Sequence, residues 1–226
     1  AEESLFICST DAAQRLEQHL DIDAALGQRR GISAPFRCAV GSRTHDTPRR
    51  VLQVDVREIG AEHFHAEEGC VLEPSELEVF NDASGRPRLR LPGGVAAAVP
   101  SFSIAHCAEG GAAAVGGAGR RVGVDLETVV ARPAEVIAFV SAPREDRSAR
   151  PDAPEAQARL WTAKEAALKL LGLGLDADAR AVRPEAEDVA FTGLPAEVWR
   201  ELGSPRVRLA YERLEGAMLA VAFTGD

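Results

Sequence analysis

Apolar and polar residues alternate in several short segments of the second half of the chain, which is the pattern of half-buried β-strands. The predicted strands cover residues 102–106, 112–115, 121–127, 206–211 and 217–223. The repeat changes to the helical one in residues 134–140 and, most strongly, in residues 155–171, where Gly172 and Gly174 end the helix. Helices against a mainly antiparallel sheet predict an α+β fold in two layers.

The first half of the chain shows weaker patterns. A helix is predicted at residues 11–26, a strand at 51–56, and a turn at 81–85 that leads into a strand at 86–91. Residues 92–100 contain Gly and Pro and are predicted to separate an N-terminal lobe, residues 1–98, from a C-terminal lobe, residues 99–226.

Composition indicates an ordinary globular protein, since 46% of the 226 residues are hydrophobic and 27% are charged. The net charge of −9 disfavours a nucleic-acid partner. No apolar run is long enough to cross a membrane, and the first ten residues lack the features of a signal peptide, so a cytoplasmic protein is expected. The cysteines are widely spaced and predict neither disulfides nor a zinc site: Cys8, Cys38, Cys70 and Cys107.

The segment at residues 122–127 places two carboxylates on one side of a strand. The period of two puts Gly123, Asp125 and Glu127 on one face and the apolar residues on the other. Gly123 leaves room for something to approach that face. Taken alone, the pattern favours a half-buried strand with a solvated acidic side.

The helix at residues 155–171 carries a charged stripe of its own. Trp161, Glu165 and Lys169 recur every four residues, and the last two form a favourably ordered i,i+4 pair. Taken alone, this pair predicts a surface salt bridge. If the stripe meets the acidic strand, three carboxylates converge on one lysine. The repulsion then costs about 4 kcal/mol for each unpaired like-charge contact. A hard divalent cation such as Mg²⁺, which prefers oxygen ligands and substrate phosphates, removes that cost.

The two motifs, G-V-D-L-E at residues 123–127 and W-T-A-K-E-A-A-L-K at 161–169, together resemble the 4′-phosphopantetheinyl transferase superfamily. Residues 85–87 and 102–107, with Phe139 and residues 172–174, are similar to further segments of that family. The length resembles the long, surfactin-synthetase-activating type, which implies two similar lobes related by a pseudo-two-fold axis and a monomer. The rhythm of residues 53–58 is then a remnant of the duplicated motif, and a domain of a larger synthase stays an alternative.

The resemblance implies transfer of 4′-phosphopantetheine from coenzyme A to a serine of an acyl, polyketide or peptidyl carrier protein, with Mg²⁺ and release of 3′,5′-ADP. It implies catalytic roles for Glu165, as the base that accepts the serine proton, and for Lys169, beside the reacting phosphate. The implied metal ligands are Asp125, Glu127 and Glu165, and the implied coenzyme contacts are Arg86, His106 and Lys169.

Some residues depart from the family pattern or leave their roles open. Ala105 and Cys107 replace two family serines, so a hydroxyl contact to the coenzyme is expected to be missing or moved. Lys164 points about 100° around the helix from Glu165 and has either a structural or a partner-binding role. The arginines that are candidates for the coenzyme 3′-phosphate are not separated from one another: Arg29, Arg30, Arg43, Arg49 and Arg50.

Other functions stay as alternatives. A catalytically silent module that binds coenzyme A or a carrier protein is one, and a Mg²⁺-dependent phosphohydrolase that uses the same carboxylates is another. His63 and His65 can lie on one strand face, but a third metal ligand is not evident, which favours a solvated pair. The glycines at 116–119 predict a hairpin turn rather than a phosphate-binding loop.

Overall fold

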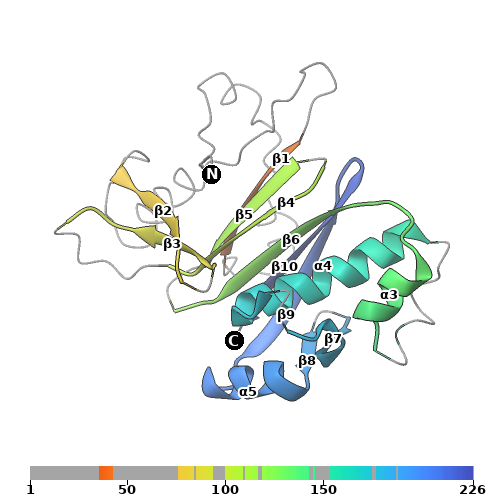
Figure 1. Ribbon diagram of the computed structural model, residues 1–226. Helices are drawn as coiled ribbons and strands as arrows, with labels where there is room; N and C mark the ends of the chain where they lie inside the picture. The colour runs from red at the N-terminus through yellow and green to blue at the C-terminus, as the bar shows by residue number, and fades with distance from the viewer. Residues whose placement is uncertain are drawn as a thin grey trace, which may run out of the picture.

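The computed structural model describes residues 36–42 and 76–225, except 84, 94–99, 109, 117–118, 143–144, 146–152, 175–176 and 187. Within these residues the strands form three antiparallel sheets (Figure 1). The first has the order β1 (Phe36–Ser42), β5 (Gly110–Gly116), β4 (Phe102–His106). The second has the order β6 (Val122–Thr128), β10 (Ala217–Gly225), β9 (Arg206–Arg213), β8 (Asp188–Phe191), β7 (Val182–Glu185). The third is the hairpin of β2 (Glu78–Asn81) and β3 (Pro87–Arg90).

Helix α4 (Pro154–Leu171) lies along the second sheet. In Figure 1 the shorter α3 (Ala134–Val140) lies beside the start of α4, and α5 (Gly193–Glu201) lies below α4, next to β8. A 3₁₀ turn at Ala179–Ala181 leads into β7. Pro154 begins α4 where no intrahelical donor is needed, and Gly172 ends the helix in the left-handed conformation at φ 75°. In the part of the chain that the structure describes, no helix is long and apolar enough to span a bilayer.

The sequence predicts most of the second half correctly. Strand β4 and helix α3 have the predicted bounds, and α4, β5, β6, β9 and β10 differ from the predictions by a few residues at their ends. The sequence prediction lacks β7, β8 and α5. These elements are short, and Pro184 and the charged residues of β7 hide its alternation. The helix predicted at 11–26 and the strand predicted at 51–56 lie outside the described residues.

The prediction of two layers does not describe the whole fold. Strands β6 and β10 are buried on both faces, so a further layer covers the face opposite α4. On one face of β10, Ala220 and Ala222 join the hydrophobic cluster of α4. On the other face, Leu219 and Val221 join a cluster that includes Ala112 and other residues of β4 and β5. The β1–β5–β4 sheet therefore covers the face that α4 leaves open. It spans the predicted lobe boundary, since β1 precedes residue 98 and β5 follows it.

Strands β4 and β6 are joined by side chains rather than by a main-chain ladder. The backbone N–H of Val124 donates to the Ser103 hydroxyl at 3.0 Å, and that of Val122 donates to the Ser101 hydroxyl at 3.3 Å. The glycines that follow β5 thus connect two different sheets, and the predicted hairpin between β5 and β6 is wrong. Residues 117 and 118 of this connection lie outside the description.

Helix α4 rests directly on β6 at Gly123. A Cβ atom at this position would collide with the carbonyl oxygen of Ala166 and lie 2.5 Å from the backbone nitrogen of Leu170. No side chain larger than hydrogen fits there, and α4 occupies the space that the sequence predicted beside this glycine. The contact fixes how closely the helix approaches the strand.

We expect Gly123→Ala to destabilise the protein by about 1–3 kcal/mol or more, because the added methyl group separates α4 from β6. Thermal unfolding followed by circular dichroism measures the effect as a lowered Tm. Gly93→Ala is the matched control, since a Cβ at Gly93 has no atom within 4 Å. Equal melting temperatures for the two variants would contradict the close contact.

Candidate active site

Asp125 lies in the middle of β6 and is only 6% exposed. The Lys169 ammonium of α4 donates to its Oδ1 atom at 2.7 Å. Its Oδ2 atom is buried and has no hydrogen-bond partner among the described residues. Burial raises the pKa of the Asp125 carboxyl, and the Lys169 charge opposes that rise. One oxygen of this carboxylate is thus satisfied, and the other is left without a donor or a cation.

Glu165 comes from α4 and is 5% exposed. Burial raises its pKa to about 7, and the nearby charge of Asp125 adds to the effect, while Lys169 opposes it. Glu127 contributes a smaller repulsion. The carboxyl of Glu165 therefore carries a proton for part of the time at neutral pH.

Glu127 lies at the more open end of β6. The guanidinium of Arg132, in the loop after β6, donates from Nη2 to its Oε2 atom at 2.5 Å. Burial raises the pKa of Glu127, the charge of Asp125 adds to this, and Arg132 opposes it. The sequence prediction did not include Arg132. Its only signal there is an Arg-Pro pair five residues after the acidic strand.

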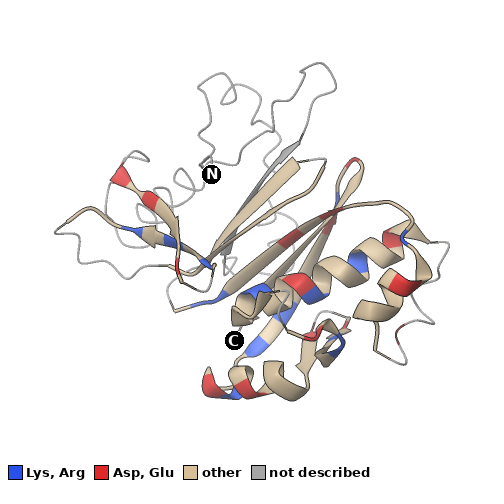
Figure 2. Cartoon of the chain, in the orientation of Figure 1, with Lys and Arg blue, Asp and Glu red and all other residues tan. Residues whose placement is uncertain are grey.

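The structure brings the four predicted residues of the metal and catalytic site within electrostatic range of one another, at the place where α4 crosses β6. Figure 2 shows acidic and basic positions side by side at this crossing. Lys169 pairs with Asp125 on the strand, which favours convergence of the two elements over the alternative of a surface salt bridge between Glu165 and Lys169.

Asp125 and Glu127 each pair with a cation, and no group of three or more His, Cys, Asp and Glu side chains within the described ranges is arranged as a metal site. The donor set nevertheless fits a hard divalent ion. Three carboxylates face two cations, Lys169 and Arg132, and the buried Oδ2 atom of Asp125 is an acceptor without a partner among the described residues. Oxygen donors of this kind suit Mg²⁺.

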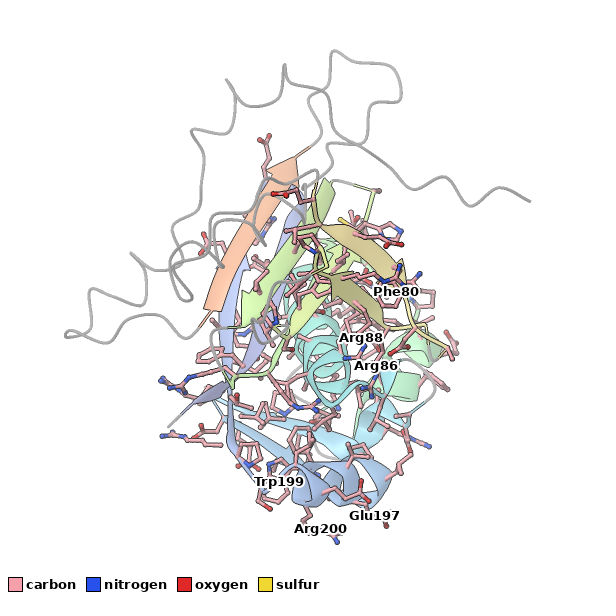
Figure 3. All side chains as sticks on the ribbon, turned by 90° about the vertical axis from the view of Figure 1, so that its left-hand side faces the viewer. Phe80, Arg86, Arg88, Glu197, Trp199 and Arg200 are labelled. Atoms are coloured by element: carbon pink, nitrogen blue, oxygen red, sulfur yellow. The ribbon has the colours of Figure 1, made fainter. Side chains whose placement is uncertain are left out.

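Arg86, predicted to contact phosphates, lies at the C-terminal end of α4. Its Nε atom donates to the Gly172 carbonyl at 2.7 Å, and its Nη2 atom donates to the carbonyls of Leu171, at 3.1 Å, and Gly172. Arg121 donates to the Leu170 carbonyl at 3.3 Å. Burial lowers the pKa of Arg121, and the nearby charges of Arg86 and Arg88 lower it further. Figure 3 shows Arg86 and Arg88 next to each other beside this helix end.

His106 is exposed at the end of β4, and the residues on either side of it point the other way. Ala105 is buried in the cluster beneath β6, and Cys107 packs against that cluster. The prediction that His106 and Cys107 point to opposite faces is confirmed. The predicted residues Arg29, Arg30, Arg43, Arg49, Arg50, His63 and His65 lie outside the described residues.

Lys164 has a structural role. Its side chain is 1% exposed, and its ammonium donates to the Glu145 carboxylate and to the carbonyls of Ala179 and Val182 at 2.7, 3.0 and 2.7 Å. Three acceptors around a buried ammonium satisfy its donors. Of the two alternatives for this residue, the structure therefore supports the first.

Residues 121–197, from β6 into α5, match the family model of the 4′-phosphopantetheinyl transferase superfamily. This segment belongs to that superfamily. The predicted family and enzyme class, a 4′-phosphopantetheinyl transferase, are thereby confirmed. The matched residues of this transferase segment include Asp125, Glu127, Glu165 and Lys169.

Two solved structures are similar to parts of the transferase chain. The holo-ACP-synthase from Plasmodium yoelii is 18% identical, with a TM-score of 0.40, over 46% of this chain and 92% of that one. The holo-[acyl-carrier-protein] synthase from Neisseria meningitidis is 20% identical, with a TM-score of 0.38, over 47% and 98%. Both TM-scores are too low to support an argument about this chain. A comparison with curated proteins gave no match.

We expect Glu165 to make the stability of the metal-free transferase depend on pH. Its folded pKa of about 7 lies above the ordinary value of 4.5. The folded state therefore binds more protons than the unfolded state between these values, and stability falls as the pH rises through this range. Urea unfolding from pH 4.5 to 8 in chelator should show Glu165→Gln gaining stability relative to wild type towards pH 8. Glu197→Gln, on an exposed position of α5, is the control, and a pH-independent difference for Glu165→Gln would contradict the buried carboxyl.

Proposed function

We propose that the protein transfers the 4′-phosphopantetheine group of coenzyme A to a serine hydroxyl of a carrier protein, with Mg²⁺, and releases 3′,5′-ADP. The proposal is carried by two features of the superfamily segment: the buried Oδ2 atom of Asp125, which has no partner among the described residues, and the raised pKa of the nearby Glu165. An enzyme gains little from burying two carboxylates side by side unless a ligand of opposite charge joins them.

Asp125, Glu127 and Glu165 would hold the metal ion. When bound, Mg²⁺ neutralises negative charge on the oxygens of the coenzyme pyrophosphate. In the metal-free protein the Lys169 ammonium donates to Asp125. A metal ion bound to this carboxylate would replace the lysine, whose ammonium could then donate to a phosphate oxygen. These assignments use the residues that the sequence predicted and add no further ligand.

Glu165 is proposed as the base. The serine oxygen forms a bond to the β-phosphorus, the bond from that phosphorus to the oxygen of 3′,5′-ADP breaks, and the serine proton moves to Glu165, directly or through a water. In the metal-free protein the pKa of Glu165 is about 7, in the range of a group that exchanges a proton at neutral pH. Lys169 stabilises the charge on the leaving phosphate or protonates it.

The arginines at the end of α4 support phosphate contacts for Arg86. Its guanidinium is held by the Leu171 and Gly172 carbonyls, and the charges of Arg88 and Arg121 lie close by. A helix C-terminus offsets part of this positive charge, and a coenzyme phosphate would offset more of it. We propose Arg86 as a coenzyme contact on these grounds, and His106 as a second contact because it matches the family histidine and is exposed at the end of β4.

The remaining proposals concern the setting of the reaction. We propose two similar lobes, residues 1–98 and 99–226, of the long, surfactin-synthetase-activating type, with coenzyme phosphate contacts in the first lobe. The protein acts as a monomer or as a domain of a synthase, in the cytoplasm, in fatty acid, polyketide or peptide synthesis.

The assay for this function is the intact mass of an apo carrier protein incubated with coenzyme A, Mg²⁺ and the enzyme. Addition of phosphopantetheine supports the transferase. Hydrolysis of coenzyme A without modification supports the alternative phosphohydrolase instead. Binding of coenzyme A without either reaction supports the silent module.

We expect Asp125→Asn and Glu165→Gln to lower the rate of transfer by about 100-fold or more, since each removes a charge at the reacting centre but keeps the side-chain volume. Initial rates from the mass assay, with thermal melts to confirm folding, measure the loss. Glu197→Gln should retain the wild-type rate. A rate near wild type for either active-site variant contradicts the proposed roles.

We expect Arg86→Gln to raise the KM for coenzyme A by about tenfold or more, because a charge-assisted hydrogen bond to a phosphate is lost. Arg206→Gln, which removes an exposed arginine paired with Asp188, should leave this KM unchanged. A lowered Tm with an unchanged KM would show that Arg86 only caps α4.

A further inference from the structure

Arg132 is a basic residue inside the acidic site for which the proposed reaction has no role. Its backbone N–H donates to the side-chain oxygen of the buried Gln157 at 2.8 Å, which fixes the loop between β6 and α3 to the first turn of α4. Its guanidinium lies over the Trp161 ring, with Cζ 5.5 Å from the ring centroid. Only 12% of the side chain is exposed. The charge is therefore held in place rather than free to move in solvent.

The guanidinium is satisfied on one side only. Its Nη2 atom donates to Glu127 and, at 3.4 Å, to the Thr128 carbonyl. Its Nη1 atom is buried and has no acceptor among the described residues. A buried charged donor without an acceptor is costly, and an anionic oxygen of a ligand is the group that would satisfy it.

Lys169 and Arg132 act as resident counter-ions of the site. Lys169 neutralises Asp125, and Arg132 neutralises Glu127, each at hydrogen-bond distance. A divalent cation that approaches Asp125 and Glu127 therefore meets two positive charges. An anionic ligand removes this repulsion by drawing the lysine and the guanidinium to its own oxygens.

We propose that Arg132 couples the binding of the divalent cation to the binding of coenzyme A, so that the cation binds weakly until the coenzyme phosphates are present. The inference rests on the proposed cation site of Asp125, Glu127 and Glu165. Arg132 pairs with Glu127 in the free protein and donates from its buried Nη1 atom to an anionic oxygen in the complex.

The alternative role for Arg132 is orientation of Glu127 as a ligand, and the two roles predict opposite effects. Loss of an orienting hydrogen bond weakens metal binding by about 10–100-fold. Loss of a neighbouring positive charge strengthens it, and repulsion between a divalent ion and a unit charge a few ångström away is the larger effect even at an effective dielectric of about 20. Removal of Arg132 should therefore tighten cation binding.

The test is titration of Mn²⁺, as a probe for the cation, by calorimetry or paramagnetic resonance, with and without coenzyme A and without carrier protein. We expect Arg132→Gln to bind Mn²⁺ about tenfold or more tighter than wild type in the absence of coenzyme. The enhancement that coenzyme A produces should shrink, and Mn²⁺ should enhance coenzyme A binding by the same reduced factor, because the coupling between two ligands is reciprocal. Arg132→Lys keeps the charge and should stay near wild type.

Arg159→Gln is the matched control, since Arg159 of α4 likewise lies over an aromatic ring, with its Cζ 4.1 Å from the Tyr211 centroid. Thermal melts in chelator check the fold, and Arg132→Met replaces Arg132→Gln if the latter does not fold. Unchanged or weaker Mn²⁺ binding in the charge-removing variant overturns the coupling. If Asp125→Asn binds Mn²⁺ as tightly as the wild-type protein does, the cation site of the proposed function is wrong.

Discussion

The whole site depends on the contact between the backbone of α4 and Gly123 of β6. The helix approaches so closely that its main chain touches the strand, without side chains between them. Asp125 follows Gly123 on the same face of the strand, and Glu165 precedes Ala166, the residue of the helix that touches Gly123. Two carboxylates from elements about forty residues apart are thereby buried together, as their exposures of 6% and 5% show.

Such a contact places negative charge where water cannot easily screen it, and the fold limits the cost in three ways. Lys169 reaches across from the helix to Asp125. Arg132 returns from the loop after β6 to Glu127. Glu165 has no cation of this kind, and its raised pKa means that it can stay protonated near neutral pH. These three effects lower the cost of the buried charges, and within the described residues the Oδ2 atom of Asp125 still has no hydrogen-bond partner.

The sequence predicted the elements that carry this site because strand and helix periodicities are local properties. It also predicted the acidic face of β6 and the role of Gly123 as a place of close approach. It did not predict the partner of Lys169, because the i,i+4 rule considers only residues on one helix and cannot weigh a buried carboxylate on a strand. The sequence also did not predict the role of Arg132. Its position over Trp161 depends on the path of a loop, which no local periodicity reveals. The short, polar strand β7 lacked a clear period.

The charges along α4 also explain why metal and phosphate chemistry suit this helix together. Glu165 lies in its second half, Lys169 lies one turn further on, and Arg86 closes its C-terminal end at the Gly172 carbonyl. A Cβ at Gly172 would collide with the Arg86 guanidinium, so the left-handed glycine that ends the helix also makes room for the arginine. From Glu165 to the C-terminal end of α4, a negative group is thus followed by positive ones. This order suits the ligand of the proposed function, because the metal complex of a pyrophosphate combines a cation with phosphates beside it.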